Sequence, residues 1–175
     1  MASIPRRIVL TGSESTGKTT LAQGVAQHLG TAWVAEFARG YAEARGGILT
    51  AADVEPIARG QFEAETAAMA GPGLVVFDTD LVSTAVYARH YYGEVPAWVE
   101  QAICRVPSSL YLLCDIDLPW VSDGVRDRPA DRTAMHERFE DALRAFGIEP
   151  LIIRGSGPAR LDRAIEAVNH WRERR

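Results

Sequence analysis

The sequence predicts an α/β fold, a three-layer sandwich in which helices cover both faces of a five-stranded parallel sheet. Five short apolar segments alternate with longer stretches that carry helical signals, which is the βαβ pattern of such folds. The last three apolar segments are nearly continuous runs, as in strands that are buried on both faces. At 175 residues the chain has the length of one domain, so we expect residues 1–175 to form a single unit with right-handed crossovers.

Turn residues and helix signals set the order of the elements. We expect strands at residues 7–12, 32–37, 73–80, 109–116 and 150–155. We expect helices at residues 19–29, 38–44, 51–70, 83–92, 96–104, 131–146 and 158–171. Thr50 and Asp53 form an N-cap pattern that begins the third helix, and the Gly-Pro-Gly stretch 71–73 ends it.

The composition argues against several classes of protein. The formal net charge is −4, so the chain lacks the basic surface that binding to a nucleic-acid backbone requires. No apolar run approaches the roughly 20 residues that span a bilayer, and the first residues do not form a signal peptide. We therefore expect a cytoplasmic protein without a membrane or nucleic-acid partner. The two cysteines and four histidines match no metal or redox spacing. The oligomeric state stays open, a homo-oligomer included.

Residues 12–19, Gly-Ser-Glu-Ser-Thr-Gly-Lys-Thr, match the G-x-x-x-x-G-K-[ST] pattern of a phosphate-binding loop. The match lies between a predicted strand and a predicted helix, so its backbone amides and the positive end of the helix dipole would face an anion. We expect Lys18 to reach the β- and γ-phosphates of ATP, and the Thr19 hydroxyl to bind Mg²⁺. The other residues expected to bind the nucleotide here are Gly12, Ser13, Glu14, Ser15, Thr16, Gly17 and Thr20. The fold class is thus that of P-loop NTPases, close to nucleoside monophosphate kinases.

Three acidic residues at the ends of predicted strands are candidates for metal binding and proton transfer. Asp78 ends the apolar run of the third strand and is expected to hold Mg²⁺ together with Thr19. Glu36 closes the second strand and is a candidate general base, with Arg39 steering substrate or phosphate; the alternative is an exposed ion pair. Asp80 is a second candidate for the base or for a substrate contact, unless it only caps the next helix.

The stretch 117–131 is charged, has no apolar period and is predicted to be a mobile lid. Arg126 in this lid is expected to stabilise the phosphoryl group during transfer, and Arg128 and Arg132 to bind the nucleotide. A solvated polar loop is the alternative.

Aromatic residues cluster after the third strand and at the start of the lid. We expect four of them to contact a flat acceptor, with an additional attraction if its ring is cationic: Tyr87, Tyr92, Trp98 and Trp120. Core or surface packing is the alternative for each.

Over almost its whole length the chain resembles the nicotinamide riboside kinase domain of the NadR-type NAD-salvage proteins. The resemblance rests, in chain order, on the segments GSESTGKTTLA, WVAEFARGY, DVEPIARGQ, VFDTDLVST, YYGEVPAWV and LYLLCDIDLPWVSDGVRD. It implies that the chain uses ATP and Mg²⁺ to phosphorylate the ribose 5′-hydroxyl of nicotinamide riboside, which gives nicotinamide mononucleotide. It also places Asp123, in the segment PWVSDGVR, among the substrate-binding residues.

The first predicted strand begins within the first ten residues, so we expect neither a DNA-binding nor a nucleotidyltransferase domain before it. Two other functions stay open. One is a small-molecule kinase of the same fold that acts on another nucleoside, a nucleotide or shikimate. The other is a nucleotide-dependent switch that hydrolyses ATP slowly and binds a protein partner.

Overall fold

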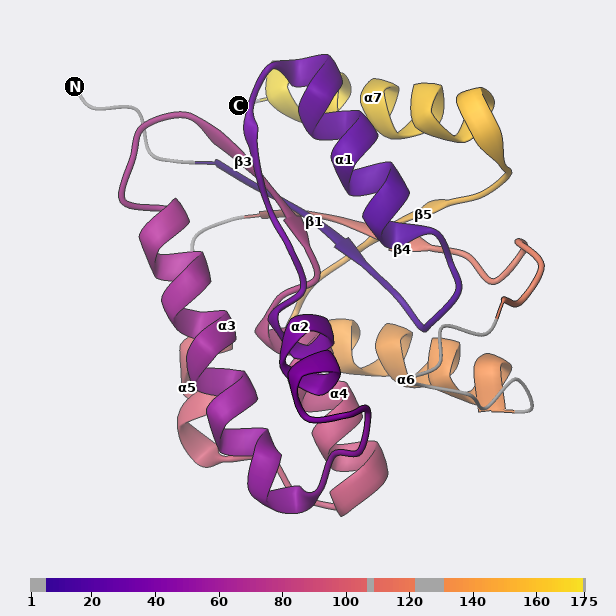
Figure 1. Cartoon of the computed structure of the whole chain (residues 1–175). Helices are drawn as coiled ribbons and strands as arrows, with labels where there is room; N and C mark the ends of the chain where they lie inside the picture. The colour runs from indigo at the N-terminus through magenta and orange to yellow at the C-terminus, as the bar shows by residue number, and fades with distance from the viewer. Residues whose placement is uncertain (1–5, 107–108, 122–130, 175) are drawn as a thin grey trace.

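Five parallel strands form the central sheet of the computed structural model, which describes residues 6–106, 109–121 and 131–174 (Figure 1). The strand order is β2-β3-β1-β4-β5, so that β1 lies in the middle. The strands are β1 (Arg6–Thr11), β2 (Ala32–Val34), β3 (Leu74–Asp78), β4 (Ser109–Cys114) and β5 (Leu151–Ile153). Each lies where the sequence predicts it, and all pairings are parallel. The predicted fold class is confirmed.

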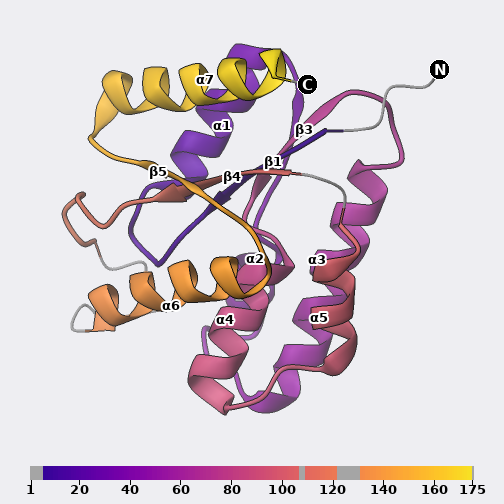
Figure 2. The same ribbon diagram turned by 180° about the vertical axis from the view of Figure 1, so that it is seen from behind.

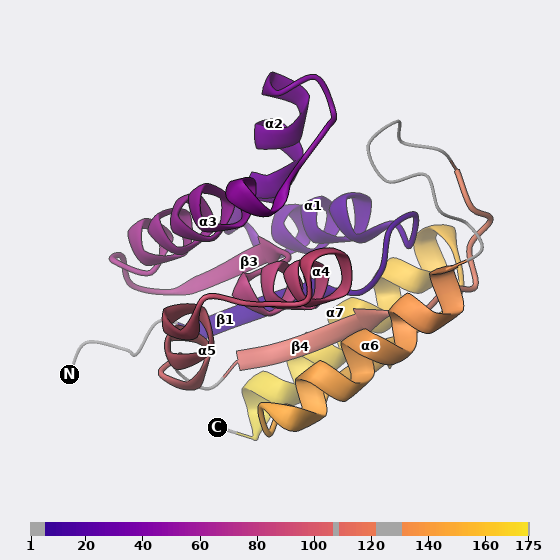
Figure 3. The same ribbon diagram turned by 90° about the horizontal axis from the view of Figure 1, so that it is seen from below.

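Helices cover both faces of the sheet, and all seven predicted helices are present. They are α1 (Lys18–Leu29), α2 (Phe37–Ala44), α3 (Val54–Ala68), α4 (Leu81–Tyr92), α5 (Ala97–Cys104), α6 (Arg132–Ala145) and α7 (Gly157–Glu173). One turn of 3-10 helix (Ala51–Asp53) precedes α3. Helices α1 and α7 cover one face of the sheet, while α3, α4, α5 and α6 cover the other (Figures 1 and 2). Helix α2 packs beside α3 at the margin of the sandwich (Figure 3).

Alternating side chains of the central strand explain the two layers. Ile8 and Leu10 point to the face that α1 and α7 cover, whereas Val9 points to the face that α4 and α6 cover. All three are completely buried. Burial on both faces is the reason why the inner strands are nearly continuous apolar runs.

The carboxyl ends of the strands meet at one edge of the sheet, and the candidate residues gather there. Strand β2 ends at Val34, earlier than predicted, so Glu36 is the N-cap residue of α2 rather than the end of a strand. The predicted start of the third helix is confirmed, because Thr50 and Asp53 form a reciprocal capping box. None of the described helices is long and apolar enough to cross a membrane.

Candidate active site

The loop between β1 and α1 folds as a phosphate cradle. Gly12 and Gly17 have φ angles of +133° and +73°, values that suit glycine. A Cβ atom on Gly12 would lie 2.9 Å from the backbone carbonyl oxygen of Cys114, so no larger residue fits there. The Thr16 hydroxyl and the Lys18 ammonium both donate hydrogen bonds to the carbonyl oxygen of Ser13, at 2.8 and 2.6 Å. These bonds close the loop and hold the ammonium group at its mouth.

A hollow of about 200 Å³ opens on this loop. Residues 15–20 line it together with Arg39 and Val121. Gly12, Ser13 and Glu14 do not line the hollow, because they form the buried base of the loop. The Glu14 carboxylate instead accepts a hydrogen bond of 3.0 Å from the Tyr87 hydroxyl.

Thr19 and Asp78 provide the oxygen atoms expected of a magnesium site. The Thr19 hydroxyl donates a hydrogen bond of 2.6 Å to Oδ2 of Asp78. Oδ1 of Asp78 is buried, and the described part of the chain offers it no hydrogen-bond partner. Burial raises the pKa of Asp78, and the Thr19 hydroxyl and the Lys18 charge partly oppose this rise. A free, buried carboxylate oxygen beside a hydroxyl fits a hard cation such as Mg²⁺. In the described ranges no group of three or more His, Cys, Asp or Glu side chains could hold a metal, so phosphate and water oxygens would complete the coordination.

A second, larger cavity of about 370 Å³ lies between the start of α2, the loop that follows α2, and helices α3 and α4. Tyr87, Tyr91 and Tyr92 line it, as do Glu36 and Thr79. The rings of Tyr87 and Tyr91 are nearly parallel, with an interplanar angle of 6° and centroids 6.1 Å apart. None of the described residues that line this cavity is a lysine or an arginine. Its chemistry therefore suits a flat ring that is neutral or positively charged.

Glu36 and Arg39 stand where the two cavities adjoin. Glu36 lines the larger cavity, Arg39 lines the phosphate hollow, and Arg39 Nε lies 3.9 Å from Glu36 Oε2. The backbone N–H of Phe37 donates a 3.1 Å hydrogen bond to Gln61 Oε1, which fixes the start of α2 and so the position of Glu36. Gln61 in turn donates to the buried Glu65 at 3.0 Å. Gln61 was not expected at the site, because a glutamine inside a helix carries no local signal of this contact.

Asp80 has a different place from the one expected of a base or a substrate contact. It is the N-cap residue of α4, where its Oδ1 accepts from the Val82 N–H at 3.0 Å. Its Oδ2 accepts from the Tyr111 hydroxyl at 2.5 Å and lies 3.6 Å from Arg7. Because Asp80 is only 2% exposed and lines neither cavity, the helix-cap alternative describes it. This geometry leaves Glu36 as the candidate base.

The two tryptophans that were expected to contact the acceptor, Trp98 and Trp120, do not line the cavities. Trp98 donates to Glu55 from α5, and the guanidinium of Arg59 lies 4.3 Å from the centroid of its ring. Neither Trp98 nor Trp120 lines the phosphate hollow or the larger cavity. The expected acceptor contact thus fits Tyr87 and Tyr92, and the packing alternative describes Trp98.

The described ends of the expected lid touch the phosphate loop. Arg132, at the start of α6, donates to the carbonyl oxygens of Leu118 at 2.7 Å and Ser15 at 3.0 Å. The Ser15 hydroxyl donates to the carbonyl oxygen of Val121 at 2.5 Å. Arg132 is therefore close to the nucleotide side of the site. Three residues expected to act here lie outside the described residues: Asp123, Arg126 and Arg128.

Comparison with known sequences identifies the family. The sequence profile of a family described as an AAA domain matches residues 7–160. The chain belongs to this AAA domain family. The trifunctional NAD biosynthesis/regulator protein NadR of Salmonella typhimurium (strain LT2) is 30% identical over 151 residues. The match covers 82% of this chain and 37% of that protein. NadR of Escherichia coli (strain K12) is 31% identical over 151 residues, and the match again covers 82% of this chain and 37% of that protein. This AAA domain thus spans about 37% of the length of the curated relatives it matches.

Solved structures agree with this similarity. A NadR protein in complex with NR superposes with a TM-score of 0.80 at 27% identity, covering 96% of this chain and 50% of that one. A NadR protein in complex with NAD and AMP-PNP gives the same TM-score and identity over 96% and 49%. The thymidylate kinase of Ehrlichia chaffeensis, 12% identical with a TM-score of 0.67 over 95% and 98%, shares the fold. The resemblance to NadR and the P-loop fold of this AAA domain are confirmed.

Proposed function

We propose that this AAA domain is a kinase that transfers the γ-phosphate of ATP to the ribose 5′-hydroxyl of nicotinamide riboside, which gives nicotinamide mononucleotide. One observation carries the proposal. The phosphate hollow and a cavity suited to a flat ring adjoin, and Glu36 and Arg39 stand between them. The similarity to NadR, which has been solved with NR and with AMP-PNP, supports these two substrates.

The larger cavity has the chemistry that nicotinamide riboside needs. Its pyridinium ring is flat and cationic, and the nearly parallel rings of Tyr87 and Tyr91 offer aromatic faces to it. Among the described lining residues Glu36 is acidic and none is a lysine or an arginine that would repel the ring. The cavity volume of about 370 Å³ is in the range of small-ligand sites.

The residues at the boundary perform the transfer. Glu36 orients the acceptor hydroxyl and accepts its proton as the oxygen forms a bond to the γ-phosphorus and the bond to the β-phosphate oxygen breaks. Lys18 and the amides of the loop stabilise the negative charge on the transferring group. Arg39, which faces the phosphate hollow, adds a second positive charge. Mg²⁺ bound at Thr19 and Asp78 would neutralise charge on the phosphate oxygens.

The test is product formation. The protein is incubated with MgATP and nicotinamide riboside, and nicotinamide mononucleotide is detected by mass spectrometry, with adenosine, thymidine and shikimate as competing acceptors in parallel. We expect the mononucleotide as the main product. Phosphorylation of another acceptor in place of nicotinamide riboside would overturn the substrate assignment but not the assignment as a kinase. Hydrolysis of ATP that ignores every acceptor and responds to a protein partner would favour a nucleotide-dependent switch.

A further inference from the structure

Arg160, in the first turn of α7, carries a buried positive charge next to the phosphate loop. Its side chain reaches the carboxyl ends of β4 and β5, where Nη2 donates to the carbonyl oxygens of Ile153 and Asp115. These bonds are long, at 3.3 and 3.4 Å, and are therefore weak. Arg160 is only 4% exposed. Its Nε and Nη1 atoms are buried and have no hydrogen-bond partner in the described part of the chain.

The charge of Arg160 also has no counter-ion among the described residues. The carboxylates of Asp115 and Asp117, which follow β4, both have other partners. Asp115 forms an ion pair with Arg154 at 2.7 Å, and Asp117 accepts a hydrogen bond of 2.5 Å from the backbone N–H of Gly155. Burying an unpaired charge is strongly unfavourable, so a buried guanidinium of this kind is a candidate to bind an anion.

The position of Arg160 shows which anion would compensate it. A Cβ atom on Gly17 would lie 3.6 Å from Nη1 of Arg160, so the guanidinium lies beside the backbone of the phosphate loop at Gly17. The loop hollow opens on residues 15–20, so Gly17 separates the guanidinium from the space that phosphates would occupy. The ammonium of Lys18 acts from the mouth of the loop, and Arg160 from the side of α7.

We propose that Arg160 is a binding residue of the nucleotide site, which attracts the phosphate chain of ATP and ADP through the Gly17 side of the loop. This rests on the proposed nucleotide binding but not on the identity of the acceptor. It has two consequences. The charge raises the affinity for nucleotides with more phosphates, and it lowers the stability of the protein without nucleotide, because none of the described residues compensates it there.

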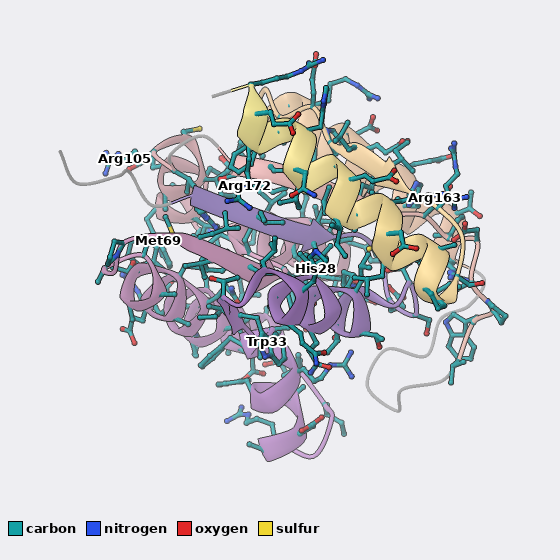
Figure 4. The ribbon with its side chains drawn as sticks, turned by 90° about the horizontal axis from the view of Figure 1, so that it is seen from above. His28, Trp33, Met69, Arg105, Arg163 and Arg172 are labelled. Atoms are coloured by element: carbon teal, nitrogen blue, oxygen red, sulfur yellow. The ribbon has the colours of Figure 1, made fainter. Side chains whose placement is uncertain are left out.

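The experiment compares Arg160→Met with Arg163→Met. Arg163 lies one turn further along α7, is exposed, and donates to the carbonyl oxygen of Arg154 on the outside of the molecule (Figure 4). Binding of MgADP and AMP is measured by isothermal titration calorimetry, and the melting temperature is measured without ligand. We expect Arg160→Met to weaken MgADP binding by about tenfold or more, to weaken AMP binding less, and to melt at or above the temperature of the unchanged protein. Arg163→Met should match the unchanged protein in all three measurements.

A second pair of variants tests whether charge is the cause. Arg160→Lys keeps the charge and should retain most of the MgADP affinity. Arg160→Gln removes the charge but keeps a polar hydrogen-bond donor, so it replaces the methionine variant if that one does not fold. Equal MgADP affinity of Arg160→Met or Arg160→Gln and the unchanged protein would overturn the inference. The inference would also be overturned if Arg160→Lys weakened MgADP binding as much as the neutral variants do, or if Arg163→Met weakened it as much as Arg160→Met does.

The outcomes separate this inference from the proposed function. If the unchanged protein binds MgADP but does not phosphorylate nicotinamide riboside, the acceptor assignment is wrong and the role of Arg160 is still decided by its variants. If the riboside is phosphorylated and Arg160→Met binds MgADP normally, only the role of Arg160 is wrong.

Discussion

Replacing Glu65 by glutamine should change how the stability of the protein depends on pH. Glu65 on α3 is buried, and its Oε2 accepts a 2.8 Å hydrogen bond from Arg7 on β1. The same guanidinium lies 3.6 Å from the carboxyl of Asp80, so one positive charge faces two buried carboxyl groups. The pKa of Glu65 is raised to about 7, mainly by burial and also by the charge of Asp80, while the charge of Arg7 opposes the rise. Near neutral pH this cluster binds a proton that the unfolded chain does not.

The sign and size of the effect follow from the two pKa values. A carboxyl whose pKa is higher in the folded protein binds protons preferentially there, so its stability contribution is greatest below the unfolded value of 4.5 and is lost as the pH rises through about 7. The folded and unfolded pKa values differ by about 2.5, and each unit of pKa difference corresponds to about 1.4 kcal/mol. Ionising Glu65 in the folded protein therefore lowers the free energy of unfolding by about 3 kcal/mol, as an order of magnitude.

Urea denaturation at pH values from 5 to 8 measures this effect. The unchanged protein should lose about 2–3 kcal/mol more than Glu65→Gln over that range, because glutamine cannot titrate. Glu63→Gln, an exposed neighbour on the same helix, is the matched control and should follow the unchanged protein. If the difference between Glu65→Gln and the unchanged protein is the same at pH 5 and pH 8, the raised pKa and the charge arrangement inferred for Arg7, Glu65 and Asp80 are wrong.

Three further predictions concern the site. Lys18→Ala should lower turnover by about 10²–10³-fold or more while the melting temperature changes little, since its ammonium is expected to stabilise transferred charge; normal turnover in a steady-state kinase assay would contradict this. Glu36→Gln should lower kcat by about 10²–10⁴-fold and leave MgADP affinity unchanged in calorimetry, whereas a change confined to nucleotide affinity would reassign Glu36. Tyr87→Phe removes the hydrogen bond to the buried Glu14 and should cost about 1–3 kcal/mol in urea denaturation; a loss below about 0.5 kcal/mol would show that the bond adds little.

Local patterns in the chain were enough to predict the fold and the phosphate loop. Apolar runs bounded by turns predicted all five strands, since burial on both faces requires such runs. The loop pattern predicted the cradle, since its glycines and Lys18 act through backbone angles and reach within a few residues. The capping box of Thr50 and Asp53 could likewise be predicted from the local sequence. In each case the physical cause lies within one short segment.

The tertiary structure decided which polar residues face the site and which are buried under it. Asp80 and Glu36 have similar positions in the sequence, each two residues after a strand. The cap that Asp80 forms is buried by contacts with distant residues, the Tyr111 hydroxyl, 31 positions away, and the Arg7 guanidinium. Arg160 gives no signal in the sequence, because the role proposed for it rests on the hydrogen-bond partners that the described residues do not offer its buried Nε and Nη1 atoms. Contacts between distant segments, and their absence, depend on how the elements pack, which the local spacing of residues does not encode.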